Sequence, residues 1–203
     1  MRKRRLFIPA ILTLAAAGLV IAWAERGGDP EEEAARLARA LQLDAGAVVA
    51  DVGAGAGQLT IAMGRLYGGK LRLIATEVNG EKLSALRGAL DAAGLRNVTL
   101  LQSGSRDPNL PGACCDAVVM RRVFHHIEHR AEFLSGLYDA GRGDARVAII
   151  DFAPSWWRFW MHRHGVGGEE VIAGMRRAGF EKEQEVSGWG WWDYCLVFRR
   201  MQR

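Results

Sequence analysis

A glycine-rich segment with one acid before it and another after it is the most informative chemical feature of the sequence. Gly53, Gly55 and Gly57 alternate with other residues just after Asp51, and Glu77 follows about twenty residues later. Glycine lets the backbone approach a ligand where a Cβ would collide. A carboxylate at about this separation suits hydrogen bonds to ribose hydroxyls. A glycine triplet alone is usually only a tight turn, but with the second acid it predicts a site for a ribose-containing cofactor.

Two adjacent histidines, His125 and His126, are the candidates for proton transfer. Histidine with an ordinary pKa can accept a proton at neutral pH. For either histidine alone, the more common role is structural, in which one caps the next helix and the other packs. As a pair at the mouth of the expected cleft, they are the candidate catalytic residues.

These residues need elements that bring them together, and strand-like apolar runs alternate with amphipathic helical runs along the chain. Strands are expected at 47–51, 71–76, 98–101, 116–120, 146–151, 181–186 and 194–200. Helices are expected from Pro30 onward and at 59–66, 81–93, 131–140 and 169–178.

This alternation predicts an α/β fold with a doubly wound, mostly parallel seven-stranded sheet and helices on both faces. The last two strand-like runs have no helix between them, which predicts an antiparallel C-terminal hairpin strand. Ligands of such sheets bind outside the carboxyl ends of the strands. The glycine segment, Glu77 and the two histidines all fall at those ends.

The first 24 residues differ from the rest in charge and hydropathy. Four of the 27 Lys and Arg residues stand at positions 2–5, and no acid precedes Glu25, so this tip supplies the net charge of +4. The neutral body lacks the basic face of a nucleic-acid-binding protein, and no nucleic-acid partner is expected. The uncharged run 6–24 is long enough to cross a membrane core of about 30 Å as a helix. Small residues at its end also fit a cleaved signal peptide.

We therefore expect an N-terminal transmembrane anchor or signal peptide at 1–24, a linker and helix at 25–46, and one domain at 47–203. The positive-inside rule places the body of an anchored chain on the non-cytoplasmic side of the membrane. A cleaved signal would make the body periplasmic or secreted.

The glycine spacing separates two cofactor classes. The dinucleotide fingerprint G-x-G-x-x-G needs glycine at position 58, where this chain has Gln58. The pattern D-x-G-x-G-x-G, from Asp51 to Gly57, instead resembles the first motif of the class I S-adenosylmethionine-dependent methyltransferases. The resemblance covers about Val48 to Phe198 and includes the C-terminal hairpin. Four further segments resemble a bacterial branch of the family that acts on small molecules: 107–111, 117–120, 123–127 and 147–151.

The resemblance implies roles for the residues of the glycine segment. Gly53, Gly55 and Gly57 would line the methionine and ribose part of S-adenosylmethionine. Asp51 would orient the loop or meet the methionine amino group. The domain at 47–203 would then be a methyltransferase domain.

Three further positions would contact the rest of the cofactor. Glu77 would hold the ribose hydroxyls, and Val78 would flank the adenine. Ser105 stands where the family often has an acid that contacts the adenine amine.

Six of the seven tryptophans lie in two clusters, at 156–160 and 189–192. Both clusters fall after the last parallel strand, where this family builds its acceptor pocket. They favour a small, apolar or aromatic acceptor. For Trp156, Trp157 and Trp160, the neighbouring arginines also favour contact with a membrane interface.

The three cysteines, Cys114, Cys115 and Cys195, show no metal-binding spacing, and no metal site is expected. Because adjacent cysteines rarely bridge each other, we expect them to be small buried side chains.

The sequence thus predicts an S-adenosylmethionine-dependent methyltransferase that acts on a small molecule. Two alternatives stay open: an NAD-type Rossmann oxidoreductase, and a catalytically degenerate cofactor-binding module at the membrane. Ser105 favours the second alternative, and so does the expected topology, because S-adenosylmethionine is made in the cytoplasm.

Overall fold

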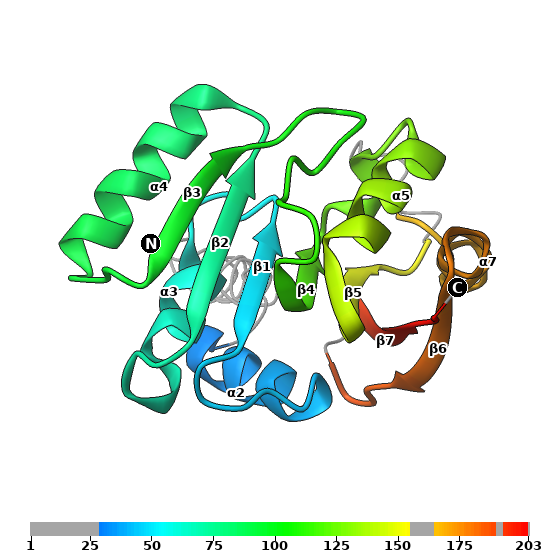
Figure 1. Cartoon of the computed structure of the whole chain (residues 1–203), viewed down its shortest axis with the longest axis horizontal. Helices are drawn as coiled ribbons and strands as arrows, with labels where there is room; N and C mark the ends of the chain where they lie inside the picture. Colours follow the sequence, from blue (N-terminus) through cyan, green and yellow to red (C-terminus); the bar gives the residue numbers. More distant parts are fainter. Residues whose placement is uncertain (1–28, 155–164, 190–192, 203) are drawn as a thin grey trace, which may run out of the picture.

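The computed structural model describes residues 29–154, 165–189 and 193–202, which form one seven-stranded sheet with helices around it (Figure 1). The strands are β1 (Val48–Val52), β2 (Arg72–Glu77), β3 (Val98–Gln102), β4 (Cys115–Arg121), β5 (Gly141–Phe152), β6 (Phe180–Glu185) and β7 (Asp193–Arg200). Their order is β3-β2-β1-β4-β5-β7-β6. The first five strands are parallel, and β7 is antiparallel to both of its neighbours.

Helices cover both faces of this sheet. One face carries α2 (Pro30–Ala40), α3 (Gln58–Arg65) and α4 (Gly80–Ala92), and the other carries α5 (Arg130–Ala140) and α7 (Gly168–Ala178). Short 3-10 turns follow α3 and β4: η1 (Leu66–Gly68) and η2 (Phe124–His126). The two faces follow from side-chain alternation along each strand. In β1, Val49 packs with residues of α2 and α3, and Ala50 packs with residues of α5 and α7.

Local sequence explains where the first helix and the first strand begin. The Asp29 carboxylate accepts the Glu31 N–H at 3.0 Å and caps α2, and Pro30 occupies the first turn. β1 is apolar apart from Asp51 and is buried along its whole length, as a parallel strand covered on both faces should be.

The architecture confirms the predicted fold class and the antiparallel C-terminal hairpin. Each predicted strand and helix is present, and most ends differ by one residue from the prediction. The largest difference is β5, which begins at Gly141 instead of Arg146, because Gly141 already pairs with Cys115 of β4.

One prediction about the cysteines was wrong. Cys114 and Cys115 form a disulfide, whereas Cys195 is free and buried as expected. In a regular strand, adjacent side chains point to opposite faces and cannot meet. The bridge lies instead where a turn enters β4, next to an irregularity in the β4–β5 register between Cys115 and Ala117.

Within the described residues, the longest helices are too short or too polar to cross a membrane. The apolar run 6–24 and Trp156, Trp157 and Trp160 lie outside the described ranges, as do Trp191 and Trp192. The predictions about them remain predictions.

Candidate functional site

The glycine segment forms the turn between β1 and α3. Its glycines have φ angles of +73° (Gly53), +56° (Gly55) and +78° (Gly57), a region that L side chains rarely adopt. A Cβ on Gly53 would lie 2.5 Å from Cγ2 of Val123, and a Cβ on Gly57 would collide with Cδ1 of Leu86. On Gly55 it would meet no protein atom within 4 Å. Packing therefore requires Gly53 and Gly57, whereas Gly55 leaves open space beside the loop.

Glu77, at the end of β2, is bonded to the same loop. One carboxylate oxygen accepts the Gly55 N–H at 3.0 Å, and the other accepts the Val78 N–H at 3.1 Å. Glu77 is only 8% exposed, so these bonds hold its carboxylate in a fixed position. The Asn79 N–H also donates to the second oxygen, at 3.4 Å. A carboxylate has about four acceptor positions, so three backbone donors leave it about one position for a ribose hydroxyl.

The two residues expected near an adenine ring lie on adjoining loops. Val78 directly follows Glu77 and is 53% exposed, which is unusual for a large apolar side chain at a strand end. Ser105 is exposed in the loop after β3, where the Gly104 N–H bonds to the Asp107 carbonyl at 2.8 Å. Both positions therefore offer surface to a ligand, and Val78 offers an apolar one.

Asp51 is buried beneath the loop. Its carboxylate accepts the Thr60 hydroxyl at 2.5 Å. Burial raises the pKa of Asp51 from 3.8 to about 6, although the Thr60 hydrogen bond and the charge of Arg121 both lower it. The site therefore contains a carboxylate that is costly to ionise. A nearby cation would favour its ionised form.

The buried Asp51 predicts a pH-dependent stability difference. Between the unfolded pKa of 3.8 and the folded pKa of about 6, the folded chain holds a proton that the unfolded chain has lost. Stability should therefore fall by on the order of 3 kcal/mol as the pH rises through this window. Asp51→Asn has no such titration, so its stability relative to wild type should increase from pH 4 to pH 6. Urea denaturation of both proteins measures this, and a pH-independent difference would contradict it.

His125 forms a pair with Asp151, the last acid of β5. His125 Nδ1 lies 2.7 Å from Asp151 Oδ1, and the His125 backbone N–H donates to Oδ2 at 3.1 Å. The Phe152 N–H also donates to Oδ1. Asp151 is fully buried, and the His125 side chain is 10% exposed. An ionised Asp151 favours the tautomer protonated on Nδ1, which leaves the lone pair on Nε2.

His126 has a different environment from its neighbour. It is exposed, and its ring centroid lies 3.9 Å from that of His125. Partial burial and the adjacent His125 lower the pKa of His126. Neither histidine caps the next helix, because the N-cap of α5 is His129. The capping role considered for one of the two histidines is therefore not observed. Of the two, His125 is the one with a buried carboxylate partner.

His125 also borders a surface hollow of about 550 Å³ at the start of α5. The hollow is lined by His125, Ile127, Glu128, His129, Arg130, Ala131 and Glu132. Among the described residues, no group of three or more His, Cys, Asp or Glu side chains is arranged to hold a metal ion.

The strand order brings these groups together. The glycine loop follows β1, His125 follows β4 and Asp151 is the last but one residue of β5, and these three strands are neighbours. Val123 packs on Gly53 two residues before His125. From the sequence, the glycine loop and the histidine pair were both predicted to lie at this edge of the sheet, but the partnership of His125 with Asp151 was not predicted. The available signal was that Asp151 closes the strand next to the histidines.

Comparison with known proteins gives one family match. Residues 49–144 match a family model described as a methyltransferase domain. No protein of curated function is significantly similar to the chain in sequence.

Solved structures share the fold. A methyltransferase from Aquifex aeolicus described as dependent on S-adenosylmethionine (SAM) is 24% identical, with a TM-score of 0.70 over 82% of this chain and 88% of that one. The pyocyanin biosynthetic protein PhzM is also 24% identical, with a TM-score of 0.68 over 85% of this chain and 54% of that one. The [4+2]-cyclase SpnF is 13% identical, with a TM-score of 0.72 over 85% of this chain and 81% of that one.

The match over residues 49–144 and the sheet topology together support a methyltransferase with the class I fold. S-adenosylmethionine is the cofactor that this match implies.

Proposed function

We propose that the chain transfers a methyl group from S-adenosylmethionine to a protonated oxygen or nitrogen of a small, apolar or aromatic acceptor. The observation that carries this proposal is the pair formed by His125 and the buried Asp151, two residues beyond the contact of Val123 with the glycine loop. A base is needed only when the acceptor atom must lose a proton, so the pair favours a hydroxyl or amine acceptor over an acceptor that is already unprotonated.

The residues that would hold the cofactor fit its parts. Gly55 leaves the open space that a close backbone approach requires, and Glu77 presents a fixed carboxylate for the ribose hydroxyls. Asp51 can pair with the ammonium group of the methionine part, and Val78 can cover one face of the adenine. When bound, the cofactor supplies an electrophilic methyl group on a sulfonium, whose sulfur keeps the bonding electron pair as the methyl leaves.

The chain's own residues would align the acceptor and move its proton. His125 Nε2 accepts the proton of the acceptor as its oxygen or nitrogen bonds to the methyl carbon. Asp151 stabilises the resulting imidazolium and holds the ring in position, as an acid partner of a catalytic histidine does. Alignment itself is worth roughly 7–11 kcal/mol in well-oriented reactions.

The tryptophans clustered at 156–160 and 189–192 favour an apolar or aromatic acceptor, and one buried aromatic side chain, Phe152, lies near His125. The ring of Phe152 lies 5.6 Å from the His125 ring, and the Arg122 guanidinium covers Phe152 at 4.7 Å. Incubating the chain with labelled S-adenosylmethionine and a panel of small phenols, aromatic amines and carboxylic acids tests the proposal. The expected products are labelled aryl methyl ethers or N-methylated aromatic amines. Formation of methyl esters alone would contradict the role given to His125.

We also infer from the sequence that residues 6–24 attach the chain to a membrane, with the body on the non-cytoplasmic side. The four cations before this run and its length support the inference. Carbonate washing of cell membranes should leave the chain in the membrane fraction, and mass spectrometry should find residues 1–24 still attached. An exported body without these residues would identify a signal peptide instead. A soluble chain that keeps its N-terminus would contradict both.

A further inference from the structure

A buried carboxylate oxygen without a hydrogen-bond donor lies at the carboxyl edge of the sheet. Asp193 begins β7, and its side chain is only 9% exposed. Arg122 approaches it with two nitrogens, Nε at 3.2 Å and Nη2 at 2.8 Å, but both donate to the same oxygen, Oδ2. Oδ1 is buried and accepts no hydrogen bond from any described residue. Because buried polar atoms are almost always paired, this oxygen needs a donor that the described residues do not supply.

The strands around Asp193 fix its position. Asp193 pairs with Phe152 at the end of β5, and its side chain lies on the sheet face to which Val197 also points, the face that carries α2 and α3. The Arg122 guanidinium lies over the Phe152 ring at 4.7 Å. The Arg122 backbone has a φ of +58°, a strained region for a residue other than glycine, and its N–H donates to the Ile150 carbonyl at 2.7 Å. A strained backbone held in this way orients the Arg122 side chain and, through it, the Asp193 carboxylate.

The charges beside Asp193 balance one another. Arg121 donates from Nε to Glu33 of α2 at 2.8 Å, which forms a second ion pair. Burial raises the pKa of Glu33, the charges of Arg121 and Arg122 lower it, and the charge of Asp193 raises it, so the two ion pairs lie close together. Within this group of four, two cations balance two anions. The missing partner of Oδ1 is therefore a hydrogen-bond donor and not a compensating charge, and a neutral hydroxyl or N–H is sufficient.

Asp193 lies on the far side of His125 from the glycine loop. The glycine loop follows β1 and Asp193 begins β7, with β4 and β5 between them in the sheet. His125 follows β4, and its ring lies 5.6 Å from the ring of Phe152. Phe152 is therefore next to both His125 and the guanidinium that holds Asp193. A small acceptor whose reacting atom is at His125 has Phe152 beside it and Asp193 beyond Phe152.

We propose that Asp193 is a specificity-determining residue, which accepts a hydrogen bond from a second, neutral hydroxyl or N–H group of the methyl acceptor. The acceptor is then a small aromatic molecule with two polar groups, one methylated at His125 and the other held by Oδ1. This inference rests on the proposed function and narrows its substrate class to phenols and aromatic amines that carry a second donor.

The test measures kcat/KM of the full chain with S-adenosylmethionine for phenol, the three dihydroxybenzenes and the three methoxyphenols. A methoxyphenol keeps the reacting hydroxyl, but its second group has no proton to donate. Losing a hydrogen bond to a charged group costs roughly 10- to 100-fold. One dihydroxybenzene should therefore exceed both phenol and the matching methoxyphenol by this factor. The comparison needs only the wild-type chain, so it does not depend on the folding of a variant.

Asp193→Asn should remove this preference and leave kcat/KM for phenol unchanged. Arg122 retains the amide oxygen, so the amide nitrogen takes the position of Oδ1 and donates where the carboxylate accepted. A general loss of activity would lower the rates for all acceptors together and would not change their ratio. Calorimetry on the chain saturated with S-adenosylhomocysteine gives a second measure without turnover. The affinity for the preferred dihydroxybenzene should fall roughly 10- to 100-fold in the variant.

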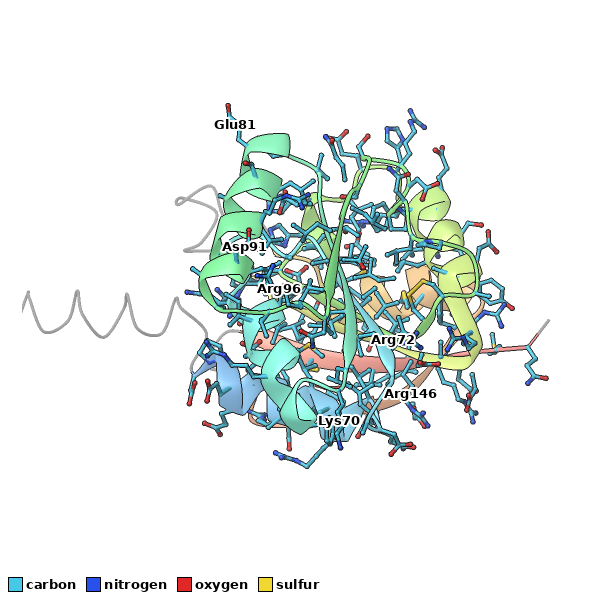
Figure 2. The ribbon with its side chains drawn as sticks, turned by 60° about the vertical axis from the view of Figure 1, so that its left-hand side comes forward. Lys70, Arg72, Glu81, Asp91, Arg96 and Arg146 are labelled. Atoms are coloured by element: carbon cyan, nitrogen blue, oxygen red, sulfur yellow. A yellow bond between two sulfur atoms is a disulfide. The ribbon has the colours of Figure 1, made fainter. Side chains whose placement is uncertain are left out.

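Glu183→Gln is the matched control. Glu183 also pairs with an arginine, Arg146, at 2.8 Å, and the two side chains are 28% and 17% exposed. The nitrogens of Arg146 donate to both oxygens of Glu183, so neither oxygen lacks a donor. This pair lies toward the opposite end of the sheet, where Figure 2 shows Arg146 on the same side of the molecule as Lys70 and Arg72 and away from Glu81. The control should keep the wild-type preference.

The outcomes separate this inference from the proposed function. Equal rates for the dihydroxybenzenes and the methoxyphenols in the wild-type chain would overturn the role of Asp193 and leave the proposed function intact. A preference that persists in Asp193→Asn, or that is also lost in Glu183→Gln, would overturn it too. A wild-type chain that neither methylates nor binds any of these phenols would overturn the phenol acceptors of the proposed function together with the role of Asp193.

Discussion

Replacing Gly55 by alanine should remove cofactor binding and leave the fold intact. The added Cβ would meet no protein atom within 4 Å, so it would project into the space beside the loop. A ligand that packs against the loop backbone would collide with it. We expect the affinity for S-adenosylhomocysteine to fall by roughly 100-fold or more, which calorimetry would record as loss of binding.

Gly46→Ala is the control for this experiment. Gly46 also has a positive φ, +95°, and a Cβ there would also meet no atom within 4 Å. It precedes β1, at the opposite end of the strand from the glycine loop. Both variants should lose about 1–2 kcal/mol of stability from the left-handed backbone, but only Gly55→Ala should lose the ligand. Unchanged affinity in Gly55→Ala would show that the loop is only a turn.

Replacing His125 by alanine should lower kcat for a phenol acceptor by about 10²–10⁴-fold, the usual contribution of a positioned base. The affinity for S-adenosylhomocysteine should not change, because no cofactor contact is assigned to His125. The defect should shrink for a nitrophenol that ionises near neutral pH, since that acceptor needs no base. Initial rates with a series of phenols of decreasing pKa would measure this trend.

Asp151→Asn is the companion variant, with a smaller expected loss in kcat. It removes the charge that holds Nδ1 protonated and that stabilises the imidazolium. Asp151 also accepts two backbone N–H groups, so thermal denaturation must accompany the kinetics. A defect in His125→Ala that is equal for weakly and strongly acidic phenols would contradict the role of a base.

The residues predicted from sequence are those whose role depends on local geometry. Gly53, Gly55 and Gly57 were recognisable because their spacing within one turn is itself the signal. Glu77 was recognisable because it closes the next strand. These positions need only one βαβ unit to be placed correctly, and the structure joins Glu77 to Gly55 directly.

The partnerships that sequence reasoning missed depend on strand order. His125 and Asp151 are 26 residues apart, and they meet because β5 lies beside β4. Arg121 and Glu33 are 88 residues apart and meet only once α2 has packed across the sheet. The Cys114–Cys115 disulfide was missed for the opposite reason, because a local rule about adjacent side chains in strands fails at the turn that enters β4.

The fold by itself does not select the reaction, since the [4+2]-cyclase SpnF has the same architecture as the methyltransferases. The chemistry must therefore be tested at the site. The cofactor residues and the His125–Asp151 pair make separate predictions, because the first concern cofactor binding and the second concerns proton transfer from the acceptor.

The most direct test of the central claim is a calorimetric titration of the wild-type chain with S-adenosylhomocysteine and, separately, with NAD. We predict binding of S-adenosylhomocysteine at one site per chain and no heat of binding for NAD. Binding of NAD alone would contradict the assignment of the glycine loop. Binding of neither ligand would contradict cofactor-dependent methyl transfer by this chain.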